Sequence, residues 1–459
     1  MKRFVFIALI LFALPAKAIR VDSLRYAPFG MLHLFHPVTA PTSVSIFISG
    51  DGGWNAGVIN MAEKLSERGS LVIGVNILQY YASLRKQSGA CYYPASDFET
   101  MSLSVQKKLR IRQYMKPVLV GYSSGATLAY GMLAQAPAGT FRGALALGFC
   151  PDIELPKPLC AGAGLRNQVI KPGKSYFLER FDKLPAPFVA LQGMTDQVCK
   201  PKATQQFLAG LPNASLVPLS NVGHGFGVLA HWLPAYVSAF DRLTKTAPAA
   251  PQVASLPDLP LTVVPPARPA ARAPFTLFLS GDGGWTSFDQ SVASAVAARG
   301  SAVVGLDAQH YFWQVRTPEG TTGDLVKVIR YYQQLFNQQE FVLAGYSFGA
   351  CVAPFVASRL PEDLKQSLRQ VVLLSPSEKG DFEIHISDML SIGSPSDTYN
   401  VLAETGKIRT LRPVCLFGSD EDAPTRDRFA EAGIPVKTLP GSHHFDNAFP
   451  AIAAAIVPL

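Results

Sequence analysis

The chain has 459 residues, of which 48% are hydrophobic and 16% are charged. This composition can form sizeable cores and excludes an intrinsically disordered protein, and the length exceeds what one ordinary core supports, so we expect two domains. The net charge of +8 is not accompanied by any recognised nucleic-acid-binding motif, so we expect no nucleic-acid partner.

The first 18 residues have the features of a secretory signal peptide. They begin with basic residues (MKR), continue with an apolar run over residues 4–14, and end in Ala16-Lys17-Ala18, which fits an A-x-A cleavage site. The apolar run is shorter than the roughly 20 residues that a membrane-spanning helix requires. We therefore predict cleavage after Ala18 and export to a bacterial periplasm, with a peripheral position at the inner membrane as a further hypothesis.

The rest of the chain contains the same pattern twice. Residues 45–54 (SIFISGDGGW) match residues 276–285 (TLFLSGDGGW), and the strand and helix signals after each block follow in the same order. Apolar strands that alternate with helices indicate a mostly parallel sheet covered by helices. We predict an N-terminal α/β domain over residues 19–245, a Pro/Ala-rich linker over 246–274 and a C-terminal α/β domain over 275–459. Further strands are expected at residues 71–75, 117–120, 144–149, 188–191 and 216–219, and at 302–306, 341–344, 371–374, 414–417 and 436–439.

The two predicted domains differ in charge. Residues 19–245 contain 22 Lys and Arg against 12 Asp and Glu, whereas residues 275–459 contain 14 against 20. One interpretation is that the basic domain faces an anionic membrane while the acidic domain attracts a cationic head group. Two ordinary solvated surfaces are at least as compatible with these counts.

Each copy contains a Gly-x-Ser-x-Gly pentapeptide between a predicted strand and a predicted helix. These are residues 121–125 (GYSSG) and 345–349 (GYSFG). A sharp turn of this kind exposes the serine hydroxyl at a helix N-terminus, where amides and the helix dipole favour a developing negative charge. The pentapeptide alone is a weak signal, but its recurrence in the same context predicts a nucleophile at Ser347 and a second candidate at Ser123.

A nucleophilic serine needs a histidine base and an acid that orients this base. In α/β hydrolases the three residues follow in the order serine, acid, histidine, and both copies keep this order, with each acid and base just past a predicted strand. The candidates are Ser347, one of Asp420, Glu421 and Asp422, and His443 in the C-terminal copy, and Ser123, Asp196 and His224 in the N-terminal copy. We therefore predict two tandem α/β-hydrolase-like domains, with the N-terminal triad either active or retained for docking.

Alignment of the copies on the phenylalanine that lies two residues after His224 makes His443 the C-terminal base. His444 is then a neighbour, either a substrate contact or an ordinary loop residue. Trp285 and Tyr311 are further candidate substrate contacts, although a tryptophan is more often a packing residue.

The acid of the C-terminal copy is left open by the sequence. The register of Asp196 favours Glu421, but Asp420 and Asp422 lie in the same loop, and two of these three are expected to form an ordinary acidic turn.

The oxyanion hole requires backbone N–H donors near the serine. We expect one from the residue after the nucleophile, Phe348, and one from the glycine-rich turn at Gly283, Gly284 and Trp285. The corresponding N-terminal groups are Ser124 and the turn at Gly52, Gly53 and Trp54.

The cysteines indicate an oxidising compartment and no metal site. We expect two disulfides among Cys91, Cys150, Cys160 and Cys199, in any of three pairings, and buried thiols at Cys351 and Cys415. No histidine or cysteine spacing resembles a zinc site, and we expect neither a metal nor a cofactor.

Several blocks together resemble the bacterial VirJ/AcvB family. They are the paired SGDGGW and GYSxG blocks, YFW at 311–313 followed by RTPE at 316–319, and SHHFD at 442–446. The resemblance covers nearly the whole mature chain, with the two-domain layout of AcvB and a shorter VirJ-like part from about residue 275.

The resemblance implies a periplasmic serine hydrolase that releases the amino acid from aminoacylated phosphatidylglycerol, chiefly the lysyl form, with Ser347 as nucleophile and His443 as base. Its partner would be an anionic phospholipid at the membrane surface, besides periplasmic proteins. The alternatives are a generic periplasmic carboxylesterase and a non-catalytic binding or escort protein linked to virulence secretion.

Overall fold

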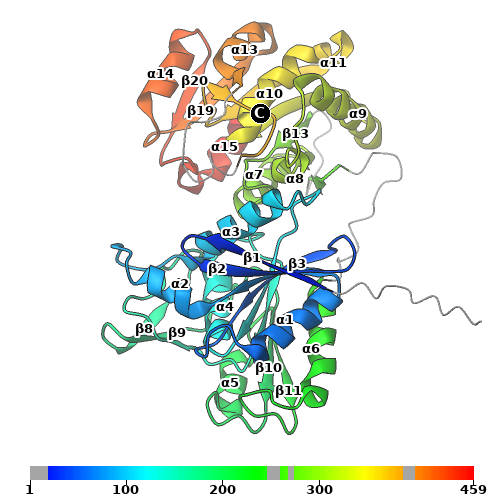
Figure 1. The fold of residues 1–459 in the computed structure, drawn as a ribbon. Helices are drawn as coiled ribbons and strands as arrows, with labels where there is room; N and C mark the ends of the chain where they lie inside the picture. Colours follow the sequence, from blue (N-terminus) through cyan, green and yellow to red (C-terminus); the bar gives the residue numbers. More distant parts are fainter. Residues whose placement is uncertain (1–18, 245–258, 267–272, 386–397, 459) are drawn as a thin grey trace, which may run out of the picture.

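The computed structural model describes residues 19–244, 259–266, 273–385 and 398–458, and it contains two α/β domains (Figure 1). The predicted signal peptide lies outside the described residues. Within these ranges, no helix has the length and apolar character needed to cross a bilayer.

The N-terminal domain is built on an eight-stranded sheet in the order β1-β2-β4-β3-β5-β6-β10-β11. The pairs β1–β2 and β2–β4 are antiparallel and the later pairs are parallel. Helices α1 and α6 cover one face and α2 to α5 the other, so each face has its own hydrophobic core. The strands are β1 (Arg20–Tyr26), β2 (Gly30–His36), β3 (Ser43–Ile48), β4 (Ser70–Val75), β5 (Val118–Tyr122), β6 (Gly143–Leu147), β10 (Phe188–Gly193) and β11 (Ala214–Leu219). The helices are α1 (Ala56–Glu67), α2 (Ile77–Leu84), α3 (Pro94–Lys108), α4 (Ser124–Gln135), α5 (Pro201–Leu208) and α6 (Leu229–Thr244).

The C-terminal domain has a seven-stranded sheet in the order β12-β14-β13-β15-β16-β19-β20. Only the β12–β14 pair is antiparallel among the described strands of this sheet. Helices α7 and α15 cover one face, and the remaining helices lie over the other. The strands are β12 (Leu261–Val264), β13 (Phe275–Leu279), β14 (Val303–Leu306), β15 (Phe341–Tyr346), β16 (Leu368–Leu374), β19 (Pro413–Gly418) and β20 (Val436–Leu439). The helices are α7 (Ser287–Ala298), α8 (Ala308–Tyr311), α9 (Pro318–Phe336), α10 (Phe348–Arg359), α11 (Glu362–Ser367), α13 (Val401–Lys407), α14 (Ala423–Glu431) and α15 (Phe449–Ile456), with 3₁₀ turns at Arg409–Leu411 and Phe445–Asn447.

Two small sheets complete the described structure. One joins β7 (Asp152–Ile153), β9 (Ser175–Leu178) and β8 (Asn167–Lys171), and the other joins β17 (Lys379–Gly380) and β18 (Tyr399–Asn400).

The central strands explain why the sequence predicted the fold class. Every residue of β3, β4, β6 and β10 is buried, as expected for parallel strands that have helices on both faces and therefore form continuous apolar runs. The strands predicted from these runs, and the mostly parallel α/β architecture, are confirmed.

Two parts of the sheets were not predicted. The hairpin of β1 and β2 was missed because β1 is exposed along most of its length and has no apolar run. Strand β12 lies within residues 246–274, so the linker prediction is wrong for Leu261–Val264. This short β-branched segment pairs antiparallel with β14 at the sheet edge, where β2 pairs with β4 in the other domain, and edge positions tolerate the prolines that flank it.

The structure resolves the pairing of the cysteines. Cys91 is bonded to Cys160, and Cys150 is bonded to Cys199. Cys351 and Cys415 are buried free thiols, as predicted.

Removal of the Cys150–Cys199 disulfide by a double change to serine is expected to lower the free energy of unfolding by about 4 kcal/mol, because the bond closes a long loop in the unfolded chain; the two residues are 49 positions apart. Denaturant unfolding measures this loss. The double change at Cys91 and Cys160, which are 69 positions apart, is the matched control and is expected to cost a similar amount. A loss under about 1 kcal/mol for both pairs would contradict the expectation.

Trp313 connects the two domains. It follows α8, it is only 1% exposed, and its ring lies 5.3 Å from the ring of Tyr114 in the N-terminal domain. Its indole N–H donates a hydrogen bond of 2.9 Å to the carbonyl of Ile111, and the ammonium of Lys107 lies 4.9 Å from the ring centre. Figure 1 shows α3, which carries Lys107, at the border between the domains. The described domains are therefore in direct contact through a buried aromatic side chain.

Candidate active sites

Both predicted nucleophiles lie at the apex of a strained turn between a strand and a helix. Ser123, between β5 and α4, has φ 55° and ψ −121°, and Ser347, between β15 and α10, has φ 51° and ψ −112°. Such angles are unfavourable for a residue with a side chain and persist only where the surroundings enforce them. A Cβ at Gly349 would lie 2.3 Å from the carbonyl oxygen of Leu279, so the close approach of α10 to β13 requires glycine there.

The N-terminal triad residues form a continuous chain of hydrogen bonds. Ser123 Oγ lies 2.9 Å from His224 Nε2, and His224 Nδ1 lies 2.9 Å from Asp196 Oδ2. Asp196 is 2% exposed, and its other oxygen accepts hydrogen bonds from the backbone N–H groups of Val198 and Cys199. These three side chains therefore have the relative arrangement that a nucleophile, a base and an orienting acid require.

Asp196, Cys199 and His224 also lie close enough together to suggest a metal site. However, the sulfur of Cys199 is bonded to Cys150, and the two other side chains are hydrogen-bonded to each other. This group therefore offers no thiolate, and we interpret it as part of the triad.

In the C-terminal domain, the histidine base contacts Glu421. Glu421 Oε1 lies 2.6 Å from His443 Nδ1, while Oε2 accepts hydrogen bonds from the Gly418 N–H at 2.7 Å and the Ser375 hydroxyl at 2.8 Å. Of the three acids that the sequence left open, the structure thus brings Glu421 to the base, in the register of Asp196.

The two neighbouring acids have other contacts. Asp420 accepts from the Ser419 hydroxyl, and Asp422 accepts from Thr425 at the start of α14. Both residues are exposed, so they lie on the rim of the site rather than in its interior.

Glu421 is held in its ionised form by its partners. Burial alone would raise the pKa of its carboxyl group, but the hydrogen bonds from His443, Gly418 and Ser375 outweigh this effect and lower the pKa below the usual value. A permanent carboxylate at this position can hold the imidazole in one tautomer and stabilise the imidazolium that forms during catalysis. Ser375 was not predicted, since its contribution arises only when β16 and β19 become neighbours.

The C-terminal site differs from the N-terminal site in the contact between serine and histidine. Ser347 and His443, both of which the structure describes, are not joined by a hydrogen bond, and the His443 side chain is 45% exposed against 19% for His224. Catalytic hydrogen bonds of this kind are often long before substrate binds.

The predicted oxyanion-hole donors are only partly suitable. Ser124 and Phe348 are the first residues of α4 and α10, where backbone N–H groups have no partner within the helix. Gly284, in contrast, donates its N–H to the carbonyl of Gly281 within a tight turn, at 3.0 Å. The prediction of Gly284 as a donor is therefore wrong, whereas Gly283 and the backbone of Trp285 remain predictions.

Two of the three predicted substrate contacts, Trp285 and Tyr311, have partners within the C-terminal domain. The Trp285 ring lies against Gly305 and Phe278, and its indole N–H donates to Gln290. Tyr311 is 2% exposed, and its hydroxyl donates to Asp324. The prediction for Tyr311 is therefore wrong, because its side chain is buried, whereas Trp285 is half-buried and remains a predicted substrate contact.

His444 remains a predicted substrate contact. It is exposed beside the base, and its ring lies 5.5 Å from that of Phe288. Partial burial and the neighbouring His443 lower its pKa, which favours the neutral imidazole.

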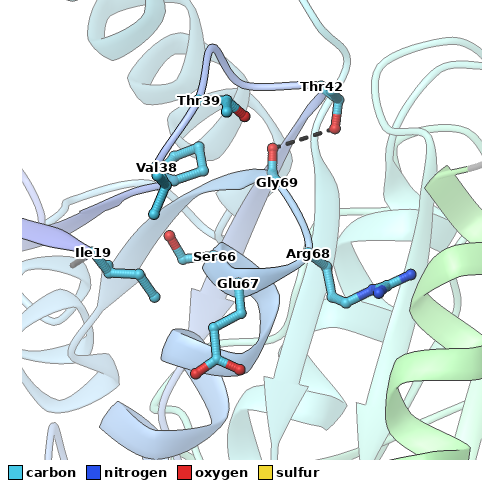
Figure 2. Close-up of a pocket in the computed structure, with 9 residues that line it drawn as sticks. Ile19, Val38, Thr39, Thr42, Ser66, Glu67, Arg68 and Gly69 are labelled. Atoms are coloured by element: carbon cyan, nitrogen blue, oxygen red, sulfur yellow. Dashed lines mark hydrogen bonds between the residues drawn. The ribbon is translucent and has the colours of Figure 1, made fainter. Parts of the chain in front are cut away.

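A separate pocket lies at the end of the N-terminal sheet where the parallel strands begin, opposite the end that carries the triad loops (Figure 2). It is formed around Thr42 and Gly69, where β3 and β4 begin, whereas the triad loops follow the ends of the strands. Figure 2 shows Glu67 and Arg68 beside it, but no histidine lines it. We therefore do not assign the chemistry to this pocket.

The N-terminal domain places a carboxyl group near the C-terminal glycine-rich turn. The pKa of Glu99, on α3, is raised to about 7: burial is the largest cause, Lys116 lowers the pKa in part, and the charge of Asp282 in that turn adds to the rise. Asp282 also interacts with other groups of the protein. The contact between domains thus reaches the surroundings of the C-terminal site, which the sequence could not indicate.

The raised pKa of Glu99 predicts a loss of stability as the pH rises. A carboxyl group whose folded pKa exceeds its unfolded value stabilises the folded state below the unfolded pKa, and this contribution disappears as the pH rises through about 7. Glutamine does not titrate, so Glu99→Gln is expected to remove part of the difference in unfolding free energy between pH 5.5 and pH 8. We expect this part to be about 1–2 kcal/mol, less than the full pKa shift would give, because solvent screens a half-buried group. Denaturant unfolding at both pH values, with wild type as control, checks this; identical pH dependences would contradict it.

The order of the strands and of the triad residues, with a serine at each elbow, defines the class of protein. Both domains have the α/β-hydrolase fold, and the chain is a serine-hydrolase-like protein. Comparison with known families is more specific. The profile of the bacterial virulence protein (VirJ) family matches residues 42–143 and 274–458, and the chain belongs to this family. The resemblance noted in the sequence is thereby confirmed.

Solved structures are similar in fold to about half of the chain. The esterase domain of a Rhodothermus marinus protein is 16% identical with a TM-score of 0.33, and the match covers 49% of this chain and 98% of that one. XC6422 from Xanthomonas campestris, an α/β serine hydrolase without a lid, is 20% identical with a TM-score of 0.33, and the match covers 51% and 98%. Est1E from Butyrivibrio proteoclasticus is 13% identical with a TM-score of 0.32, and the match covers 49% and 98%. No protein with a curated description matches the sequence.

Proposed function

We propose that the protein is a periplasmic hydrolase that cleaves the aminoacyl ester of aminoacylated phosphatidylglycerol, chiefly the lysyl form, at its C-terminal site. The observation that carries the proposal is the Glu421–His443 pair beside the Ser347 elbow, in a chain of the VirJ family. The two disulfides support an oxidising compartment, which fits the predicted signal peptide.

The acid loop of the C-terminal site supports a cationic substrate. Backbone hydrogen bonds align this loop with the acid loop of the N-terminal site. The N–H groups of Ser419 and Asp420 donate to carbonyls at the positions that accept from Met194 and Thr195 in the N-terminal domain. At the positions of Thr195 and Gln197, the C-terminal loop has Asp420 and Asp422. Exposed carboxylates on the rim attract a positively charged aminoacyl group, as does the acidic balance of the whole domain.

The reaction needs only the groups of the site. His443 accepts the proton of Ser347 as Oγ attacks the aminoacyl carbonyl, and the N–H of Phe348 stabilises the oxyanion. Collapse of this intermediate releases the glycerol hydroxyl of the lipid, which takes its proton from His443. Water then hydrolyses the aminoacyl-serine with His443 again as base, giving free lysine and phosphatidylglycerol. An aminoacyl ester is activated enough for this course without further cofactor chemistry.

Vesicles that contain lysyl-phosphatidylglycerol test the proposal. The mature protein is expected to release lysine and leave phosphatidylglycerol, as measured by mass spectrometry of both phases, whereas the double variant Ser123→Ala/Ser347→Ala is expected to release none. Release of fatty acid in place of lysine, or activity confined to soluble esters, would favour a generic carboxylesterase. Vesicle binding without any hydrolysis would favour an escort protein.

A further inference from the structure

We propose that the N-terminal domain is a second, independent hydrolase site, which cleaves esters with an apolar acyl group. This activity is distinct from the release of a cationic amino acid at the C-terminal site. Three observations support it: the completeness of the triad, the way in which the acid is held, and the apolar rim of the site.

The N-terminal triad has both of its hydrogen bonds in place. Ser123, His224 and Asp196 are joined at 2.9 Å and 2.9 Å, and the carbonyl of His224 accepts a hydrogen bond of 2.9 Å from the Tyr122 hydroxyl. The histidine is thus fixed from two directions. A docking domain would not need the strained serine, since such backbone angles are unfavourable and persist only where the surroundings enforce them.

The buried acid is fully supported. The side chain of Asp196 has no exposed area. Its Oδ1 accepts from two backbone N–H groups at 2.8 and 2.9 Å, and Oδ2 accepts from His224 and from Gln192. An ionised carboxylate remains stable in such a place only when its hydrogen-bonding capacity is filled. The Cys150–Cys199 disulfide anchors the same turn.

The loops around this triad present apolar side chains to solvent. The large apolar residues that are at least one-third exposed include five from the loops or helix starts that follow β4, β10 and β11. They are Leu78 (48%), Met194 (45%), Val198 (64%), Val228 (55%) and Leu229 (38%). We refer to these five as the apolar rim. Leu78 reaches the glycine-rich turn, because its Cδ1 would lie 3.3 Å from a Cβ at Gly53.

The C-terminal site lacks this character at the aligned positions. Leu78 corresponds to Gln309, Met194 to Ser419 and Val198 to the smaller Ala423. The two sites therefore share their catalytic groups but differ in the residues of their rims. These rim residues determine which acyl group of an ester substrate the site accepts. An apolar rim around an open serine site fits a fatty acyl ester, whose chain gains by leaving water.

The step itself follows the usual acyl transfer. Ser123 Oγ attacks the acyl carbonyl while His224 takes its proton, and the alcohol leaves with that proton. Water then adds to the acyl-serine, with His224 as base, and releases the carboxylic acid. Asp196 orients the imidazole and stabilises the imidazolium that forms.

Full-length protein with p-nitrophenyl octanoate and p-nitrophenyl acetate tests this proposal. We expect Ser123→Ala to lower kcat/KM for the octanoate at least about 100-fold, while octanoate hydrolysis persists in Ser347→Ala. A fluorophosphonate probe, followed by peptide mass spectrometry, should label Ser123 in both wild type and Ser347→Ala. Loss of octanoate hydrolysis and of all labelling in Ser347→Ala would overturn the proposal.

A rim variant separates the site from its selectivity. The double change Met194→Ser/Val198→Ser should raise KM for the octanoate several-fold more than KM for the acetate. The matched control is Val169→Ser, which alters an equally exposed valine (60%) on β8, away from the triad loops, and should leave both values unchanged. Equal effects of the rim variant on the two esters would overturn the assignment of an apolar acyl group.

Discussion

Replacing Glu421 by glutamine is expected to lower kcat for lysine release by about 10⁴-fold, the size of effect found when the acid of a serine triad loses its charge. Glu421 Oε1 lies 2.6 Å from His443 Nδ1, so an amide there can present an N–H to the imidazole and favour the wrong tautomer. The protein should still fold, because glutamine retains the shape of the side chain. Steady-state kinetics on vesicles of lysyl-phosphatidylglycerol provide the measurement.

Asp420→Asn and Asp422→Asn are the matched controls for this prediction. Both acids lie on the rim, so each change should raise KM for the lysyl lipid a few-fold with little change in kcat, as expected for the loss of an interaction present before and during the reaction. If Asp420→Asn or Asp422→Asn lowered kcat as much as Glu421→Gln, the assignment of the acid would be wrong.

Trp313→Ala is expected to weaken the contact between the two domains by about 3–5 kcal/mol, the usual cost of truncating a fully buried tryptophan. The change removes the ring that packs against Tyr114 and the hydrogen bond to Ile111. It also leaves Lys107 without the ring beneath it, although Lys107 keeps its ion pair with Glu383 at 2.8 Å.

The same change should reach the C-terminal site. The neighbouring Phe312 lies 5.1 Å, ring to ring, from Phe348, whose N–H is the expected oxyanion donor. We therefore expect a several-fold fall in kcat for lysine release together with the fall in stability. Differential scanning calorimetry and kinetics should be compared with Trp313→Phe, which keeps an aromatic ring at this position while it loses the hydrogen bond and part of the buried volume. Unchanged unfolding and kinetics in Trp313→Ala would show that the contact has no energetic role.

The sequence predicted those parts of the fold that depend on local pattern and repetition. Buried parallel strands are continuous apolar runs, so β3, β4 and their counterparts could be predicted from these runs and from their repetition in the chain. The elbows were visible because Gly345 and Gly349 are needed where the backbone passes close to its neighbours. The register of Asp196 indicated Glu421, because the two copies form the same backbone hydrogen bonds in this loop.

Other features depend on contacts between distant segments. Neither the support of Glu421 by Ser375 nor the burial of Trp313 against the other domain could be predicted, because neither contact leaves a local pattern in the sequence. Tyr311 was predicted as a substrate contact, yet its side chain is buried and its hydroxyl donates to Asp324. Strand β12 was hidden by the prolines around it.

The most direct test of the central claim is lysine release from lysyl-phosphatidylglycerol vesicles by the full-length protein, with Ser347→Ala compared against Ser123→Ala. The proposed function predicts that Ser347→Ala lowers release at least about 10³-fold, while Ser123→Ala retains most of it. The opposite partition, with release lost in Ser123→Ala and retained in Ser347→Ala, would contradict the assignment of aminoacyl-ester hydrolysis to the C-terminal site.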